Sequence, residues 1–170
     1  MGKWNDTDEP LAYLITFRTY GTWLHGDERG SIDRYHNKYG GQRTVVSPDR
    51  EKTHASRLKS EPFLLGAEAR RIVENAIREV CSYRSWSLFA VNVRTNHAHV
   101  VVSGLAPSGK MLNDFKSYST RRLRENGLWT LDHSPWVDKG SRRNLWNEQH
   151  VLSASDYVVN GQGGPLPEFD

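Results

Sequence analysis

Two histidines separated by a single residue, His97 and His99, are the strongest candidates for a chemical role in this chain. They lie in a segment, 87–103, that is rich in β-branched residues and bounded by turn formers, which predicts β structure. Because side chains alternate along a strand, both imidazoles would lie on one face, with Ala98 on the other. Neutral imidazole is the commonest metal ligand, so the pair predicts two ligands of one divalent ion. An accidental, solvated pair is the alternative that these two residues leave open.

A tyrosine and a glutamine near the C-terminus, Tyr157 and Gln162, are the candidate partners of the histidine pair. A tyrosine hydroxyl is a covalent nucleophile in some enzymes, although its pKa of about 10 makes it weak. A metal ion that polarises a phosphate would compensate for that weakness, and a glutamine amide oxygen is an acceptable third ligand. These groups suit phosphoryl transfer from DNA to tyrosine if the helix of Tyr157 packs beside the histidine strand. The alternatives are a packed aromatic residue and an ordinary polar residue after a helix end, and spacing does not decide between them.

Tyr118 is a competing nucleophile. Its neighbours Lys116, Arg121 and Arg122 would neutralise a phosphate. The apolar residues at helical spacing around Tyr118 favour core packing instead.

Basic residues gather in the second half of the chain, between 116 and 143, although the whole protein has a formal charge of only +3. Such a local excess is typical of a surface that contacts a phosphate backbone, and arginine matches phosphate geometry well. A solvated helix face followed by a basic loop explains the composition equally well. The predicted DNA contacts are Lys116, Arg121, Arg122, Arg142 and Arg143.

Three tryptophans, Trp129, Trp136 and Trp146, are candidates for stacking on unpaired DNA bases. We expect core packing instead for at least Trp146. The single cysteine, Cys81, falls within a helical pattern and is interpreted as a core thiol rather than a nucleophile.

The hydrophobic periodicity predicts an α+β fold with the strand and helix order of a ferredoxin-like sandwich. The expected elements are a strand over 11–20, a helical region from Glu61-Pro62 to Tyr83, strands over 86–95 and 98–103, a helix over 109–125, a last strand at Trp136-Val137, and a final helix from an Asn147 cap to Asn160.

The length of 170 residues favours one domain over 1–170, with an irregular insertion over 25–60 and a flexible tail over 163–170. No apolar run is long enough to span a membrane, and the N-terminus lacks an apolar signal region. One cysteine excludes an internal disulfide framework and suits a reducing cytoplasm.

Three segments together resemble the HUH single-strand DNA transposases, most closely the REP-associated tyrosine transposases. They are the Asn96-His-Ala-His-Val-Val-Val motif, the Asn113–Arg124 helix, and the Asp156-Tyr-Val-Val-Asn-Gly-Gln-Gly segment. The resemblance covers most of residues 11–164, apart from 31–60.

This resemblance implies a ferredoxin-like, RRM-like antiparallel sheet with helices on one face and a C-terminal helix that carries the tyrosine. It implies that His97, His99 and Gln162 hold Mg²⁺ or Mn²⁺. Tyr157 would attack a DNA phosphate, leaving a 5′-phosphotyrosine and a free 3′-hydroxyl. The implied substrate is single-stranded DNA near hairpins, and the implied setting is a homodimer associated with the bacterial nucleoid in the cytoplasm.

The chain departs from the simplest pattern of that family at one point. Gln162 follows Tyr157 by five residues rather than four, with Gly161 between them, so its role as a ligand needs a distorted or ending helix. Two other hypotheses stay open: a catalytically inactive or domesticated nucleic-acid-binding module of the same fold, and a small metal hydrolase, which lacks a carboxylate base nearby in the sequence.

Overall fold

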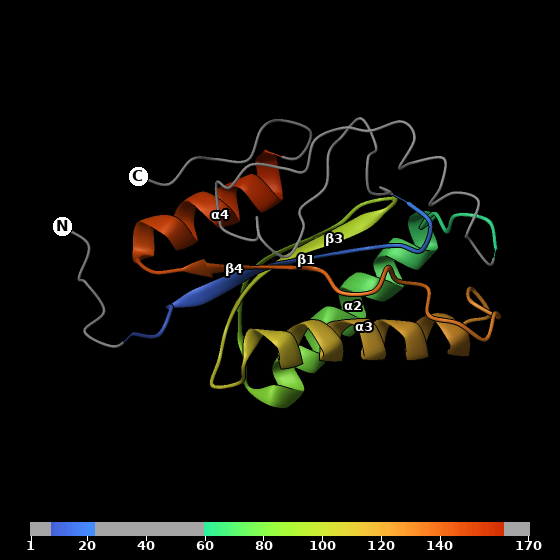
Figure 1. Ribbon diagram of the computed structural model, residues 1–170, viewed down its shortest axis with the longest axis horizontal. Coiled ribbons are helices and arrows are strands. Elements are labelled where there is room, and N and C mark those ends of the chain that lie inside the picture. The colour runs from blue at the N-terminus through green and yellow to red at the C-terminus, as the bar shows by residue number, and fades with distance from the viewer. Residues whose placement is uncertain (1–7, 23–59, 162–170) are drawn as a thin grey trace.

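The structure is a computed structural model that describes residues 8–22 and 60–161. The predicted insertion, up to residue 59, and the predicted tail over 163–170 lie outside these residues, as does Gln162. The described residues form a four-stranded antiparallel sheet with helices on both faces (Figure 1).

The strands are arranged in the order β2-β3-β1-β4, so the first strand in the sequence is central in the sheet. Their bounds are β1, Ala12–Arg18; β2, Ser87–Val93; β3, His97–Ser103; and β4, Ser141–Leu145. β1 pairs with β3 so that Arg18 is opposite His97 and Thr16 is opposite His99. The central pairing therefore brings residues about eighty positions apart side by side.

Two helices, α2 (Ala67–Arg84) and α3 (Ser108–Glu125), cover one face of the sheet, and α4 (Glu148–Asn160) lies on the other (Figure 1). The alternation along β1 explains how one strand serves both layers. Ile15 and Phe17 are buried in the cluster under α2 and α3, whereas Leu14 is buried in the cluster under α4. The α+β, ferredoxin-like fold predicted from the sequence is confirmed.

The ends of two helices follow from local residues, as predicted. The Asn147 side chain caps α4 by accepting a hydrogen bond from the His150 amide at 2.9 Å. Asn126 and Gly127 end α3, and Gly127 has the positive φ of +69° that glycine adopts without strain. Cys81 is buried, and burial raises the pKa of its thiol to about 11, which agrees with its assignment as a core residue.

The predicted last strand at Trp136-Val137 is wrong, because β4 is formed by Ser141–Leu145. Trp136 makes only an isolated bridge to Thr19, and its indole Nε1–H donates to the Lys116 carbonyl on α3. The indole is therefore buried in the core between the sheet and α3. β4 itself reads Ser-Arg-Arg-Asn-Leu and has no apolar alternation that would mark it as a strand.

The predicted helix start at Glu61-Pro62 is also wrong, because α2 begins at Ala67. The preceding segment is held in a non-helical path by backbone hydrogen bonds: the Phe63 amide donates to the Tyr20 carbonyl at 2.9 Å, and the Leu65 amide to the Thr95 carbonyl at 2.7 Å.

Candidate active site

The histidine pair lies at the start of β3, on the sheet face that α4 covers. His99 is buried and His97 is half-buried, and their ring centroids are 4.7 Å apart. The strand alternation that was expected from the sequence produces this arrangement, because Ala98 between them points into the cluster under α2 and α3.

An oxygen atom contacts the Nδ1 atom of each imidazole. Asn96 Oδ1 lies 2.7 Å from His97 Nδ1, and Thr16 Oγ1 lies 2.6 Å from His99 Nδ1. An amide oxygen only accepts, so His97 Nδ1 carries the proton and its Nε2 holds the lone pair. The Thr16 hydroxyl can donate or accept, and His99 has the same tautomer when the hydroxyl accepts. In this tautomer the lone pair of the ring lies on Nε2, which is the atom that a metal ion would bind.

The turn before His97 is fixed by two buried threonines at the end of β1. The Asn96 carbonyl accepts from the Thr19 amide at 2.9 Å and from the Thr19 hydroxyl at 3.2 Å. The Thr22 hydroxyl donates to the Thr19 carbonyl at 2.8 Å. These bonds hold the turn against β1. The turn therefore positions the Asn96 side-chain amide beside His97.

Tyr157 lies on α4 with its ring centroid 5.6 Å from that of His99. The side chain is 7% exposed and packs in the same cluster as Leu14 and Val101. The Asn92 amide of β2 donates to the Val158 carbonyl at 2.9 Å and ties α4 to the sheet at this point. The structure therefore brings together His97, His99 and Tyr157 from two elements that are distant in the sequence.

The end of α4 is fitted closely around Tyr157. The helix ends at Asn160, and the Gly161 amide donates to the Tyr157 carbonyl at 2.9 Å. A Cβ atom at position 161 would lie 3.1 Å from both Tyr157 Cα and its ring atom Cδ2, which is tighter than most real contacts. Glycine at this position thus allows the chain to turn against the tyrosine.

The competing tyrosine, Tyr118, lies on α3 on the other face of the sheet. It packs against the cluster under α2 and α3, and the Arg121 guanidinium carbon lies 4.7 Å from its ring centroid. The sheet thus separates Tyr118 from the histidine pair.

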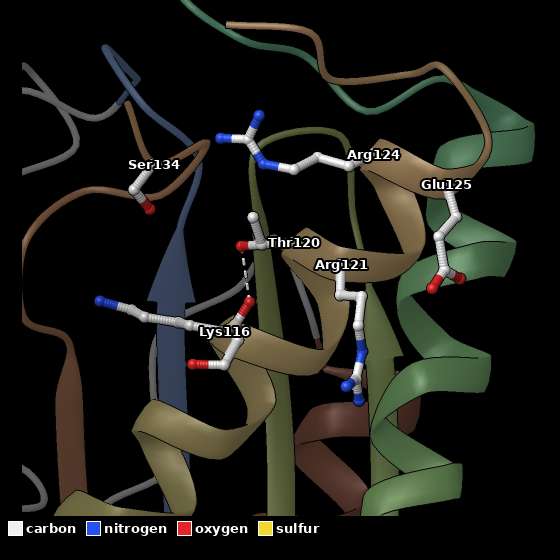
Figure 2. Close-up of a pocket in the computed structure, with 7 residues that line it drawn as sticks. Lys116, Thr120, Arg121, Arg124, Glu125 and Ser134 are labelled. Carbon is white, nitrogen blue, oxygen red and sulfur yellow. Dashed lines mark hydrogen bonds between the residues drawn. The ribbon is translucent and has the colours of Figure 1, made fainter. Parts of the chain in front are cut away.

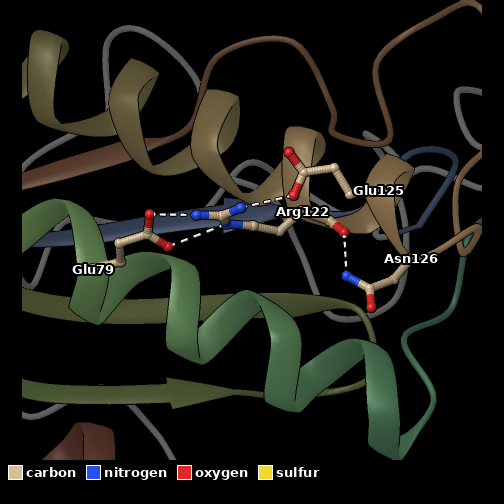
Figure 3. A network of polar contacts seen from close by, with 4 residues as sticks. All are labelled: Glu79, Arg122, Glu125 and Asn126. Carbon is tan, nitrogen blue, oxygen red and sulfur yellow. Dashed lines mark hydrogen bonds and ion pairs between the residues drawn. The ribbon is translucent and has the colours of Figure 1, made fainter.

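The predicted DNA contacts fall in different environments. Arg122 is held by two carboxylates, Glu79 at 2.5 Å and Glu125 at 2.7 Å, and these interactions raise the pKa of Arg122 (Figure 3). Arg143 is buried on the same sheet face as the histidines, whereas Arg142 is exposed. Lys116 and Arg121 line a surface pocket on α3.

The expectation for the tryptophans is reversed in the structure. Trp146, expected in the core, is 44% exposed, whereas Trp129 and Trp136 are buried. The Trp129 Nε1–H donates to the His133 carbonyl at 2.7 Å, so the polar group of this indole is also hydrogen-bonded within the protein. Trp146 follows β4 directly and precedes the α4 cap, which leaves its indole at the surface.

The donor set fits a divalent cation as far as the structure describes it. Two imidazoles share one face, and each has an oxygen partner on Nδ1 of the kind that orients metal-binding histidines. Within 8–22 and 60–161, no group of three or more His, Cys, Asp or Glu side chains is placed to hold a metal. A third protein ligand would therefore be of another type, such as an amide, or lie outside these residues.

Sequence reasoning missed Thr16 and Asn96 as supporting residues of this site. A signal was present for each: Thr16 occupies the histidine face of β1, and Asn96 adjoins His97 directly. No helix in the described ranges is long and apolar enough to cross a bilayer.

Comparison with known proteins adds two findings. The family described as "Transposase IS200 like" matches residues 55–158. The fold is similar to the crystal structure of a Deinococcus radiodurans protein provisionally named a transposase, with a TM-score of 0.51 and 12% identity over 97% of this chain and 100% of that chain. No curated protein matches the chain. At this identity the structural likeness shows the fold alone.

Proposed function

The chain belongs to the IS200-like transposase family, which gives it a transposase-type function, and we propose that it cleaves single-stranded DNA with Tyr157 as the nucleophile. The observation that carries this proposal is the placement of Tyr157 beside the histidine pair, with its ring 5.6 Å from that of His99. A nucleophile beside two metal-binding side chains is the arrangement that metal-assisted phosphoryl transfer requires.

The proposed metal ligands are His97, His99 and Gln162. Mg²⁺ or Mn²⁺ held there would polarise the scissile phosphate and stabilise the charge that develops on it. Two imidazole nitrogens favour Mn²⁺ over Mg²⁺, because Mg²⁺ prefers oxygen ligands. Asn96 and Thr16 would orient the two rings, and their partners on β1 would keep the rings in place when DNA binds.

In the proposed step, the Tyr157 hydroxyl oxygen attacks a backbone phosphorus, and the bond between that phosphorus and the 3′ oxygen breaks. The tyrosine proton passes to solvent and the 3′ oxygen takes up a proton. The products are a 5′-phosphotyrosine and a free 3′-hydroxyl. Burial of the tyrosine ring under α4 would hold the nucleophile at a fixed distance from the phosphate, which favours reaction by orientation.

The family resemblance also supports two finer parts of the proposal. The DNA substrate would carry a hairpin near the cleaved phosphate, and the protein would act as a homodimer. Hairpin-bearing DNA and the same sequence without a hairpin, compared in one cleavage assay, test the first part. The mass in solution, measured by light scattering, tests the second.

The central experiment incubates the protein with labelled, hairpin-bearing single-stranded DNA and Mn²⁺ and detects covalent adducts on a denaturing gel. We expect an adduct with the wild type and none with Tyr157→Phe, because phenylalanine lacks the attacking oxygen. Tyr118→Phe is the matched control and should retain the adduct.

Three results would contradict the proposal. If Tyr157→Phe retains the adduct and Tyr118→Phe loses it, the nucleophile is Tyr118. DNA binding with no cleavage under any divalent metal would instead support a binding module of the same fold. Metal-dependent cleavage without an adduct would indicate a hydrolase.

A further inference from the structure

A surface pocket of about 530 Å³ lies along α3, on the sheet face opposite to the histidine pair. Its lining includes three cations, Lys116, Arg121 and Arg124, and the hydroxyls of Thr120 and Ser134. Figure 2 shows Lys116 and Arg124 extending from α3 on the side where Ser134 lies, with Arg121 on the other side of the helix. The pocket is thus a basic groove over the outer surface of α3.

Some basic side chains on α3 are neutralised by ion pairs, and others form no ion pair within the described residues. Arg122 is paired with Glu79 and Glu125, and Lys110 is paired with Asp114. The three pocket cations form no ion pair within the described residues. Glu125, an acidic residue of the lining, is already engaged by Arg122 (Figure 3). The pocket therefore carries a net positive charge.

The wall opposite α3 is fixed to it by hydrogen bonds. The Lys116 ammonium donates to the carbonyls of Val137 and Lys139, and the Trp136 Nε1–H donates to the Thr120 hydroxyl at 3.0 Å. The loop that carries Ser134 is thus anchored to the helix, so the pocket is formed before any ligand binds. A preformed site loses less entropy when it binds a ligand.

The pocket and the histidine pair lie at the same end of the sheet, where β1 ends and β3 begins. The Val137 amide donates to the Arg18 carbonyl at 2.9 Å, and the Tyr20 amide donates to the Pro135 carbonyl at 2.7 Å. On the other side of β1, Arg18 is opposite His97. The end of β1 is therefore flanked by the pocket wall on one side and by the site on the other.

We propose that this pocket binds a backbone phosphate of the same DNA strand that the histidine and tyrosine site cleaves. The strand would then pass around the end of the sheet and contact the protein on both faces. This inference rests on the proposed function. Guanidinium groups and hydroxyls are the usual partners of phosphate oxygens, and a volume of about 530 Å³ accommodates a phosphodiester with its sugars.

The test measures binding of single-stranded oligothymidylates of increasing length by fluorescence anisotropy, at several salt concentrations and without metal. The double variant Arg121→Gln/Arg124→Gln should bind long strands about tenfold more weakly at low salt. Its dependence of log K on log salt should be less steep by about 0.7, because one phosphate is no longer neutralised by the protein. A strand too short to reach both surfaces gains nothing from joining them, so the double variant should reduce its affinity less than that of a long strand.

The matched control is Arg70→Gln/Arg71→Gln, which removes the same charge from α2 outside the pocket lining. It should leave the salt dependence unchanged, and Arg121→Lys/Arg124→Lys should restore most of the affinity for long strands. Equal reductions in affinity in the two glutamine double variants would overturn the proposal, since the effect would then be one of overall charge. A reduction seen with RNA but absent with DNA would overturn it too.

Failure of this inference is distinct from failure of the proposed function. The anisotropy measurement needs no cleavage, and the adduct assay with a short strand needs no binding at α3. If the glutamine double variant binds long DNA like the wild type while adducts still form, the pocket proposal alone is wrong. If no adduct forms but the double variant binds long DNA more weakly, the tyrosine mechanism alone is wrong.

Discussion

Within the described residues, a neutral oxygen atom lies close to the Nδ1 atom of each histidine ring. Asn96 Oδ1 and Thr16 Oγ1 lie 2.7 and 2.6 Å from the Nδ1 atoms of His97 and His99. Partners of this kind fix the tautomer and raise the affinity of metal-binding histidines. At the scale of single residues, the site is therefore defined by the pair and by these two supporting side chains.

Thr16→Val should weaken Mn²⁺ binding about tenfold, because valine keeps the shape of threonine but removes the hydroxyl that hydrogen-bonds to His99 Nδ1. Isothermal titration calorimetry with Mn²⁺ on the full chain measures this directly, without any cleavage assay. Thr16→Ser keeps the hydroxyl and should bind Mn²⁺ nearly as well as the wild type. Equal affinities in the valine and serine variants would show that the hydroxyl has no role in orienting His99.

Lys116 gives the α3 pocket a titratable cation. Burial lowers the pKa of Lys116 to about 8; the nearby Asp138 carboxylate acts in the opposite direction and Arg18 in the same direction. As the pH rises from 7 to 9, the Lys116 ammonium loses its proton, and the affinity for single-stranded DNA at low salt should fall. Lys116→Arg stays charged over this range and should remove that part of the fall. An identical pH profile in both proteins would exclude Lys116 as the source.

Deprotonation of Lys116 should affect folding stability and DNA affinity in opposite directions as the pH rises. The folded pKa of Lys116 lies below the ordinary lysine value of 10.5, so between pH 8 and that value the unfolded chain binds more protons. The contribution of Lys116 to the free energy of unfolding therefore rises with pH in this window, while DNA affinity falls. Urea unfolding of the wild type and of Lys116→Arg at several pH values separates the two effects.

At the scale of elements, α4 is the helix on which the candidate site depends. It is a short helix of thirteen residues, and it rests on the sheet through a cluster centred on Ala154, Tyr157 and Val158. Its first turn is fixed by the Asn147 cap, and its last turn closes against Gly161.

Asn147→Ala should lower the free energy of unfolding by about 1 kcal/mol, because the first turn of α4 loses the oxygen that accepts from the His150 amide. Chemical denaturation followed by circular dichroism measures the change. Asn147→Asp keeps an acceptor at the cap and should be nearly as stable as the wild type. If the alanine and aspartate variants have the same stability, the cap makes no contribution.

Elements with strong periodicity were predictable from the sequence, and elements defined by tertiary contacts were not. The apolar stripe of α3 and the alternation of β1 specify their own faces, so strand geometry alone places Leu14 and Phe17 in different clusters. β4 has a polar, arginine-rich sequence and is a strand only because β1 offers it a pairing edge. The segment before Ala67 departs from a helix because Tyr20 and Thr95 capture its amides.

The candidate site shows the same division. Alternation along β3 predicted that both histidines share a face. No local pattern, however, shows that α4 packs over them, because that contact depends on Asn92 and on the packing of Tyr157 against the sheet. The tryptophans were misassigned for the same reason: whether an indole is buried depends on the helix opposite it, here α3 for Trp136.

At the scale of the whole molecule, one sheet separates two surfaces of different character. The α4 face carries buried histidine and tyrosine side chains, and the α2–α3 face carries a basic groove. Both lie near the end of β1, so a strand of DNA held by the two surfaces would wrap around the end of the domain. Both surfaces pack on the same central strands, so a ligand bound at either surface should raise the free energy of unfolding of the whole domain.

Mn²⁺ should therefore raise the unfolding temperature of the whole protein. A ligand that binds only the folded state stabilises it by about 2.7 kcal/mol at a concentration one hundred times its Kd. Thermal unfolding with increasing Mn²⁺ measures the shift, which should disappear in His97→Ala/His99→Ala and persist in Arg121→Gln/Arg124→Gln. Mg²⁺ should need a higher concentration for the same shift, since two of the proposed ligands are nitrogen atoms. A shift of equal size in the double-alanine variant would show that the metal binds elsewhere and that His97 and His99 are not its ligands.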